Sequence, residues 1–373
     1  MRSAWLIPCR AIFERLPMTE HVYPTDHPVM VTGATGFVAG WLVRRLLEEG
    51  LTVHAPVREP SNAEKTAHLD RMAAELPGEL KLFEADLLDD GSYGPAMEGC
   101  AVVFHTASPF TSNFDDPQRD LVDPAVNGTR NVLETANRTP SVQRVVVTSS
   151  CAAIYGDNKD VQKAPGKVLT EETWNTTSSL DRQPYSYSKV EAEKAAWAIA
   201  DAQSRWRLVT INPSLVIGKT ISGNSTSESH TILKQFGDGT LKAGAPPMEI
   251  GMVDVRDVAE AHLRAGFLAD ARGRHIASAQ TVSFLELGQM LRQHFGDDWP
   301  FPTRELPKWL LWLIGPMVSK QLSRQMISDN MGYPWRADNS KSKRGLGIEY
   351  HPVSDAAAEM FQQLIDTGVL KKG

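Results

Sequence analysis

The stretch VMVTGATGFVAGWLVRRLLEEG, residues 29–50, decides how the chain begins to fold. Its first four residues form a short apolar run, which predicts a buried strand. From FVAG onward the apolar residues recur three and four positions apart, which predicts a helix that ends at Gly50. Gly33 and Gly36 lie between the two, and Ala39 holds the third position of a GxxGxxG/A pattern. Such a turn bends tightly and brings the N–H groups of the helix N-terminus to a pyrophosphate. We therefore predict a dinucleotide-binding turn, with a plain tight turn as the alternative.

Further apolar runs alternate with helical patterns along the next part of the chain. Strands that alternate with helices predict a parallel, doubly wound sheet, whose buried strands read as near-continuous runs of Val, Ile and Leu. The fold class that follows is α/β with a Rossmann-type sheet. The further predicted strands are LTVHAPV (51–57), ELKLFEAD (79–86), AVVFHTA (101–107), VQRVVVTSS (142–150) and RLVTINPSLVIG (207–218).

The rhythm of strands and helices changes near the end of the sixth predicted strand. Residues 219–250 are rich in Gly, Ser, Thr and Pro and are expected to form loop. We predict that residues 28–218 are mainly the NADP-binding domain with the catalytic residues. Residues 219–373 are predicted to be mainly a smaller C-terminal substrate-binding lobe, with some segments returning to the first domain. Residues 1–27 are expected to be a disordered extension, with a targeting segment as the alternative.

The composition narrows the class of protein. The chain has 373 residues, 42% hydrophobic and 23% charged, and a net charge of -6, which is ordinary for a globular protein and points to no nucleic-acid partner. The three cysteines form no CxxC pair and the ten histidines form no ligand-spaced cluster, so no metal site is predicted. We expect a reducing, cytoplasmic setting.

The most apolar segment is WLLWLIGPMV, residues 309–318. It is shorter than the roughly 20 residues that a membrane span needs, so no span is predicted. We expect it to line a core or a pocket, with a membrane-surface anchor as the alternative. Trp309 and Trp312 are candidate contacts of an apolar substrate.

The end of the second predicted strand indicates which dinucleotide is bound. An enzyme that uses NAD has a carboxylate there for the ribose diol, whereas this chain has Val57 followed by Arg58. Arg58 can form paired hydrogen bonds with a 2′-phosphate, and Lys65 follows on a helical stretch. The sequence therefore favours NADP(H). Asp86, at the end of the third strand, is a candidate acceptor for the adenine amino group, or else a helix cap.

The stretch PYSYSK contains a candidate acid–base pair. Tyr185 and Lys189 are four residues apart and share a face of the predicted helix, whereas Tyr187 lies about 200° away from Tyr185. A tyrosine with a pKa of about 10 is a weak acid–base group at neutral pH, and a nearby ammonium lowers that pKa. Ser149 and Ser150 end the fifth predicted strand, where open α/β sheets bind their ligands, and could hold the substrate oxygen.

The glycine turn, the strand-end serines and the tyrosine–lysine pair together resemble the extended short-chain dehydrogenase/reductase family, of the NAD(P)-dependent epimerase/dehydratase type. The similarity covers about residues 29 to 370. It is closest to the group of dihydroflavonol reductases, cinnamoyl-CoA reductases and aldehyde reductases. The motifs that carry it are VTGATGFVAGWLV, VREPSNAEK, EADLLD, VFHTASP, NGTRNVLE, VVVTSSCAA, YSYSK, INPSLVIG and VDVRDVAEAH.

The resemblance implies a carbonyl reductase in which NADPH delivers a hydride to the carbonyl carbon. Tyr185 would give its proton to the oxygen, Ser150 would hydrogen-bond that oxygen, and Lys189 would bind the nicotinamide ribose and lower the pKa of Tyr185. Besides Tyr185 and Lys189, the implied cofactor contacts are Gly33, Thr35, Gly36, Phe37, Val38, Arg58, Lys65, Asp86, Leu87, Thr106, Ala107, Ser108, Pro213, Ser214 and Val216.

Two departures from the group bear on the substrate. Tyr155 stands where dihydroflavonol reductases carry a flavonoid-binding Asn, and QPYSYSK replaces the NWYCYGK of cinnamoyl-CoA reductases. We therefore expect an aldehyde or ketone reductase of unassigned substrate, monomeric or homodimeric, with Tyr155 as a substrate contact beside Ser150 and Tyr185. The alternatives are a 3-beta-hydroxysteroid-type dehydrogenase, a sugar-nucleotide epimerase or dehydratase with bound NAD, and an NADP-sensing binding module. Arg58 argues against the epimerase, and the tyrosine–lysine pair argues against the module.

Overall fold

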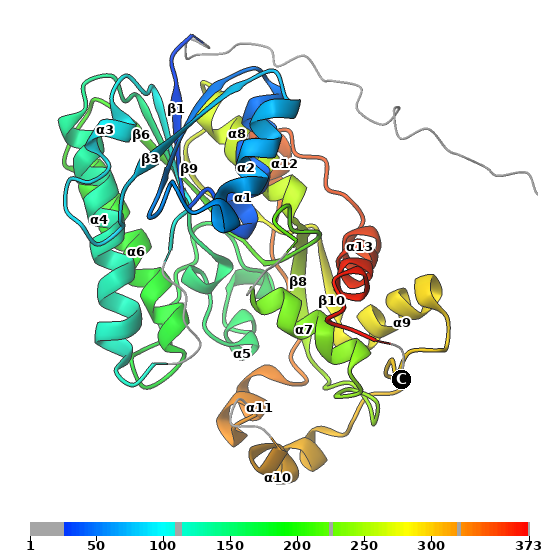
Figure 1. Ribbon diagram of the computed structural model, residues 1–373. Coiled ribbons are helices and arrows are strands. Elements are labelled where there is room, and N and C mark those ends of the chain that lie inside the picture. Colours follow the sequence, from blue (N-terminus) through cyan, green and yellow to red (C-terminus); the bar gives the residue numbers. More distant parts are fainter. Residues whose placement is uncertain (1–25, 109–113, 224–226, 319–321, 372–373) are drawn as a thin grey trace, which may run out of the picture.

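The larger of two sheets forms the centre of the molecule. The computed structural model describes residues 26–108, 114–223, 227–318 and 322–371. The larger sheet has seven parallel strands in the order β3-β2-β1-β4-β5-β6-β9 (Figure 1). Because the order reverses between β1 and β4, the predicted doubly wound fold is confirmed, and the carboxyl ends of these two strands adjoin where such sheets bind ligands. The strands are β1 (Val29–Thr32), β2 (Thr52–Val57), β3 (Glu79–Glu84), β4 (Val102–His105), β5 (Arg144–Thr148), β6 (Arg207–Pro213) and β9 (Gly273–Ala277).

Helices cover both faces of this sheet (Figure 1). On one face α1 (Phe37–Glu48) packs against α8 (Val255–Phe267), with α2 (Ala63–Glu75) beside them. On the other face lie α3 (Gly94–Met97), α4 (Asp123–Arg138) and α6 (Pro184–Asp201). The periodic apolar residues of the sequence explain this arrangement, since Leu42, Leu46, Val132 and Leu133 are all fully buried against the strands.

The smaller sheet has three strands in the order β10-β8-β7. Strand β8 (Glu249–Asp254) runs parallel to β7 (Leu215–Ile217) and antiparallel to β10 (Gln280–Ser283). Three helices, α7 (Glu228–Gly237), α9 (Phe284–Phe295) and α13 (Val353–Asp366), enclose a second core with it. This core contains several aromatic rings in contact, for example Phe295 and Phe361 with centroids 4.8 Å apart.

The remaining helices are short. α10 and α11 pack together at the end of the molecule away from the larger sheet (Figure 1). Within the residues that the structure describes, no helix is both long enough and apolar enough to cross a bilayer. The remaining short helices are α5 (Asn158–Val161), α10 (Lys308–Val318), α11 (Arg324–Asn330) and α12 (Ser340–Gly345).

Two predicted elements differ from the structure. The prediction of one strand over residues 207–218 is wrong, because the chain passes at Ser214 from β6 in the larger sheet to β7 in the smaller one. The prediction of loop over residues 219–250 is wrong where α7 and the start of β8 lie. Leu233 and Phe236 of α7 are fully buried in the second core, so tertiary packing stabilises this helix despite its polar flanks.

The division of the chain at residue 218 stays our proposal. α8 and β9 follow that residue but pack with the larger sheet, as returning segments would. Of the predicted extension, residues 1–25 lie outside the described residues.

Candidate active site

The glycine turn joins β1 to α1 at the carboxyl edge of the larger sheet. Gly33 has φ +69°, and a Cβ at this position would lie 3.0 Å from the Cα of Ala107, so only glycine fits without strain. The Gly36 N–H donates to the Gly33 carbonyl at 2.8 Å, and Gly36 begins α1 without a side-chain cap. Thr35 and Gly36 are exposed and Phe37 is half-buried. The first-turn N–H groups of α1 are thus available to an anionic ligand, which fits a dinucleotide.

A threonine fastens this turn to the end of β4. The hydroxyl oxygen of Thr32 accepts hydrogen bonds from the N–H groups of Thr106 (3.1 Å) and Ala107 (3.0 Å), and it lies 3.0 Å from Nδ1 of His105. His105 is buried, and burial together with the charge of Lys189 lowers its pKa to about 3. His105 is therefore a neutral part of the scaffold. Thr106 and Ala107, which the resemblance implied as cofactor contacts, line the glycine turn.

The structure brings Tyr185, Lys189 and Ser108 together. Tyr185 lies in the first turn of α6, after Gln183, which has left-handed backbone angles. The Lys189 ammonium lies 5.5 Å from the centroid of the Tyr185 ring and donates to Oγ of Ser108 at 2.8 Å. The four-residue spacing of Tyr185 and Lys189 therefore does bring the two side chains into contact. Through Ser108, which follows β4, the pair also lies near the glycine turn.

The two ionisable groups of this pair are shifted in opposite directions. Burial, and next the carboxyl of Glu228, raise the pKa of Tyr185 above its ordinary value. Burial lowers the pKa of Lys189 to about 8. The expected lowering of the Tyr185 pKa is wrong for this arrangement, because removing a phenolate from water costs more than an ammonium 5.5 Å from the ring returns.

Glu228 is a site residue that sequence reasoning missed. It opens α7, within the segment expected to be loop, so no pattern pointed to it. Its side chain reaches solvent, yet the surrounding protein raises its own pKa, and its charge contributes to the raised pKa of both Tyr185 and Tyr155. Two residues further along α7, His230 packs edge-on against Phe37, with ring centroids 5.5 Å apart. The first turn of α7 therefore contacts α1 through His230 and affects Tyr185 through the charge of Glu228.

The structure separates the two serines at the end of β5. Ser149 is buried, and its hydroxyl donates to Glu193 at 2.5 Å. Ser150 is only half-buried, and its Oγ accepts from the N–H of Ala152 at 3.1 Å. That bond uses a lone pair and leaves the Ser150 hydrogen to donate elsewhere. The geometry thus supports the choice of Ser150 over Ser149.

The predicted phosphate contacts lie at the end of β2. Arg58 is exposed, and no acid precedes it. The Lys65 ammonium, also exposed, pairs with the Glu59 carboxylate at 3.0 Å. The structure therefore exposes Arg58 to solvent and gives Lys65 an acidic partner, and the phosphate contacts stay a prediction.

The other predicted cofactor residues flank the same edge. Oδ1 of Asp86 accepts from the N–H of Leu88 at 2.9 Å within a turn. The helix cap considered as the alternative is not formed, because the next helix begins only at Gly94 and has Tyr93 at its N-cap. The carbonyl of Leu87 accepts from Asn131 at 3.1 Å. Elsewhere at this edge lie Val38 in α1, Pro213 at the end of β6, Ser214 whose N–H donates to the Ala277 carbonyl at 3.0 Å, and Val216 in β7.

The predicted substrate contacts are dispersed. Tyr155 lines a pocket of about 340 Å³ together with Ile154 and Trp174, a few residues after Ser150 in the chain. Trp309 and Trp312 lie on α10 and are 68% and 42% exposed. The expectation that this segment lines a core therefore holds for Leu311, which packs with Ile327 and Met331, and is wrong for the two tryptophans.

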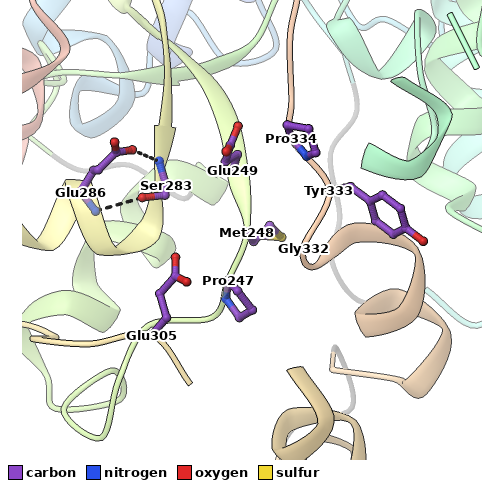
Figure 2. Close-up of a pocket in the computed structure, with 9 residues that line it drawn as sticks. All are labelled: Pro247, Met248, Glu249, Ser283, Glu286, Glu305, Gly332, Tyr333 and Pro334. Atoms are coloured by element: carbon purple, nitrogen blue, oxygen red, sulfur yellow. Dashed lines mark hydrogen bonds between the residues drawn. The ribbon is translucent and has the colours of Figure 1, made fainter. Parts of the chain in front are cut away.

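A further pocket of about 300 Å³ lies at the small sheet and contains none of the predicted residues (Figure 2). Three of its polar side chains already have structural roles. Glu286 and Ser283 form a capping box at the start of α9, and Glu249 pairs with Arg336. Among the described residues no cluster of His, Cys, Asp or Glu could hold a metal ion. The residues that line this pocket of about 300 Å³ are Pro247, Met248, Glu249, Ser283, Glu286, Glu305, Gly332, Tyr333 and Pro334.

Comparison with known proteins identifies the family. Residues 29–276 match the model of the NAD dependent epimerase/dehydratase family. The chain is 35% identical over 340 residues to cinnamoyl-CoA reductase CAD2 of Medicago truncatula, covering 90% of this chain and 95% of the relative. It is 36% identical over 348 residues to tetraketide alpha-pyrone reductase 1 of Arabidopsis thaliana, covering 92% and 96%. The solved structure of Gre2 from Candida albicans in complex with NADPH matches with a TM-score of 0.72 at 29% identity, covering 91% of this chain and 99% of that one.

Matches of this extent confirm the predicted family, the assignment as an oxidoreductase and NADP(H) as the cofactor. They leave the substrate and the role of each side chain to be argued from the site. The chain belongs to the NAD dependent epimerase/dehydratase family, in the group of reductases that includes cinnamoyl-CoA reductase.

Proposed function

We propose that the protein reduces the carbonyl group of a small molecule to an alcohol with NADPH, which supplies the hydride when bound. Tyr185 donates its phenolic proton to the carbonyl oxygen, and Ser150 donates a hydrogen bond to the same oxygen. Lys189 holds the nicotinamide ribose through its ammonium. The protein thus orients the substrate and stabilises the charge that develops on one oxygen.

One observation carries this proposal. The Lys189 ammonium contacts both the Tyr185 ring (5.5 Å) and Ser108 (2.8 Å), at the strand edge where the glycine turn also lies. A proton donor, a cation and a dinucleotide-binding turn therefore share one site. That combination favours hydride transfer coupled to proton transfer over binding alone.

The raised pKa of Tyr185 supports reduction as the direction of catalysis. A phenol with a raised pKa stays protonated through the neutral range, as a proton donor must. Oxidation of an alcohol would need the phenolate as a base, which burial and the Glu228 charge disfavour.

The cofactor contacts that we propose are those at the strand edge. The uncapped start of α1 receives the pyrophosphate, and Arg58 receives the 2′-phosphate. Cys100 and Cys151 are free, buried thiols, which is consistent with the proposed cytoplasmic setting. We propose a monomer or a homodimer, which size-exclusion chromatography with light scattering would distinguish.

The substrate is an aldehyde or ketone that the comparisons do not specify. The chain is 35% identical to a relative named for cinnamoyl-CoA and 36% identical to one named for tetraketide pyrones, so identity alone selects neither. Tyr155 stays our proposed substrate contact, because the pocket that it lines begins four residues after Ser150 in the chain.

The test is an NADPH oxidation assay of the purified full chain against a panel of aromatic and aliphatic aldehydes and ketones. We expect protein without bound cofactor that oxidises NADPH only when a carbonyl is added. Tightly bound NAD on purification, without carbonyl-dependent oxidation of NADPH, would contradict the proposal and favour an epimerase.

A further inference from the structure

A buried carboxylate lies beneath the proposed catalytic groups. Glu193 of α6 is 1% exposed, and each of its oxygens accepts several hydrogen bonds. The donors come from β5, β6, β9 and α6 itself, so this one side chain joins the strand ends to the helix. They are Ser149 Oγ (2.5 Å), Thr210 Oγ1 (3.0 Å), Asn212 Nδ2 (2.9 Å), Arg274 Nε (2.8 Å) and Nη2 (3.3 Å), and Trp197 Nε1 (3.2 Å).

The position of Glu193 on the helix relates it to the acid–base pair. It follows Lys189 by four residues and Tyr185 by eight, so all three lie along one side of α6. A carboxylate fixed to three strands therefore sets both the rotation of α6 and its position along its axis. The place of the Tyr185 hydroxyl relative to the sheet depends on both.

The same carboxylate reaches Ser150 by a second route. Asn212 donates from Nδ2 to Glu193 and also to the carbonyl oxygen of Ser150, at 3.2 Å. Ser149, bonded directly to Glu193, is the neighbour of Ser150 in the chain. Glu193 thus holds the backbone on both sides of the Ser150 hydroxyl.

Arg274 extends the network to the pocket beside Tyr155. Arg274 is 6% exposed, and its guanidinium donates to the carbonyl of Thr173 at 2.6 Å and lies 4.0 Å from the ring centroid of Trp174. Both of those residues line that pocket. The buried ion pair of Arg274 and Glu193 therefore connects the loop of a candidate substrate pocket to α6, which carries Tyr185 and Lys189.

Stability alone does not explain such a pair, since a buried ion pair is often no more stable than apolar side chains of the same volume. We propose that Glu193 is a positioning residue, which through Ser149, Asn212 and Arg274 fixes the Ser150 hydroxyl relative to the Tyr185 hydroxyl. This inference rests on the proposed carbonyl reduction, because the distance between the two hydroxyls matters only if they act on one oxygen.

The test compares Glu193→Gln with a matched control. Arg144 is also fully buried, and its guanidinium donates to the carbonyls of Ala271 (2.6 Å) and Leu268 (3.2 Å), but it lies at the opposite end of β5. We expect Glu193→Gln to lower kcat by about 10- to 100-fold, as a displacement of about 1 Å does, with the KM for NADPH changed less than about twofold. Arg144→Gln should lower Tm comparably and leave kcat within about twofold.

Ser149→Ala serves as a second variant that removes one hydrogen bond and no charge. We expect a loss in kcat of roughly three- to tenfold, and less than that when the change is added to Glu193→Gln, because the two side chains act as one unit. If Glu193→Gln does not fold, Ser149→Ala alone decides. A folded Glu193→Gln with unchanged kcat, a Ser149→Ala with unchanged kcat, or losses that follow Tm equally in Glu193→Gln and the Arg144 control would overturn the inference.

The wild-type protein and Tyr185→Phe are measured beside these variants. Absence of carbonyl reduction in the wild type, or its retention in Tyr185→Phe, would overturn the proposed function and this inference with it. Wild-type turnover that Tyr185→Phe abolishes and Glu193→Gln leaves intact would overturn the inference alone.

Discussion

Replacing Arg58 is the most direct test of the proposal that this residue binds the 2′-phosphate of NADPH. Arg58 follows β2 at the position where a carboxylate would select NAD, and its side chain is exposed. A guanidinium–phosphate contact in an exposed place contributes about 1–2 kcal/mol after solvent screening. Arg58→Ala should therefore raise the KM for NADPH roughly 5- to 30-fold. The KM for NADH, which lacks the 2′-phosphate, should change less than about twofold.

The neighbourhood of Arg58 adds an internal control. Glu59 accepts hydrogen bonds from Asn62 at 2.8 Å and from Lys65 at 3.0 Å, and these bonds lower the pKa of its carboxyl, so it is charged at neutral pH. Lys65 is therefore already paired, and Lys65→Ala should raise the KM for NADPH less than Arg58→Ala does. Glu59→Gln should lower that KM, because a negative charge near the 2′-phosphate is lost.

The assay is steady-state kinetics with each cofactor at a fixed, saturating carbonyl concentration, repeated at higher ionic strength. Added salt should shrink the difference between wild type and Arg58→Ala for NADPH. An equal rise in the KM for NADPH and NADH would refute the phosphate assignment. So would an effect of Lys65→Ala as large as that of Arg58→Ala.

Three further predictions concern the catalytic helix and its surroundings. Tyr185→Phe should lower kcat about 10²- to 10⁴-fold, while NADPH still binds and quenches protein fluorescence. Tyr187→Phe should change kcat less than about twofold, because Tyr187 lies on another face of the helix. A large loss of kcat in Tyr187→Phe would contradict this assignment of faces. The burial-lowered pKa of Lys189 predicts activity that is present below pH 8 and is lost above it as the ammonium deprotonates, and Lys189→Arg, measured across the same pH range, should remove this alkaline limb. Glu228→Gln removes a negative charge that raises the pKa of Tyr185, so the ultraviolet titration of that phenol should move to lower pH; an unchanged titration would exclude Glu228 as a neighbour.

The elements that the sequence predicted well are those whose pattern is local. The run from β1 through the glycine turn to α1 combines a strand, a turn that needs glycine and an amphipathic helix, and each part agrees with the next. Helix α1, Phe37–Glu48, starts where the pattern predicted and ends just before Gly50, because its apolar residues repeat at helical spacing. By contrast, α7 is short and flanked by polar residues, and the burial of Phe236 depends on contacts with distant segments.

The residues of the site also differ in whether a local pattern of sequence could predict them. The spacing of Tyr185 and Lys189 is a property of one helix, so it could be predicted from the residues alone. The distinction between Ser149 and Ser150 could not, because it depends on which serine faces Glu193, forty-odd residues along the chain. The exposure of Trp309 likewise follows from how few neighbours α10 has, which an apolar sequence does not reveal.

The residues that pattern reasoning missed, Glu193 and Glu228, both lie near the proposed catalytic groups and differ in what they can do. Glu193 is saturated with donors from fixed elements, so it can only hold geometry. Glu228 opens a helix of the smaller core, reaches solvent and shifts the pKa of Tyr185, so it can only alter protonation. We therefore infer that the position and the proton affinity of Tyr185 are set by separate side chains. If both act as inferred, Glu193→Gln should lower kcat without moving the Tyr185 titration, and Glu228→Gln should move the titration without displacing the hydroxyl.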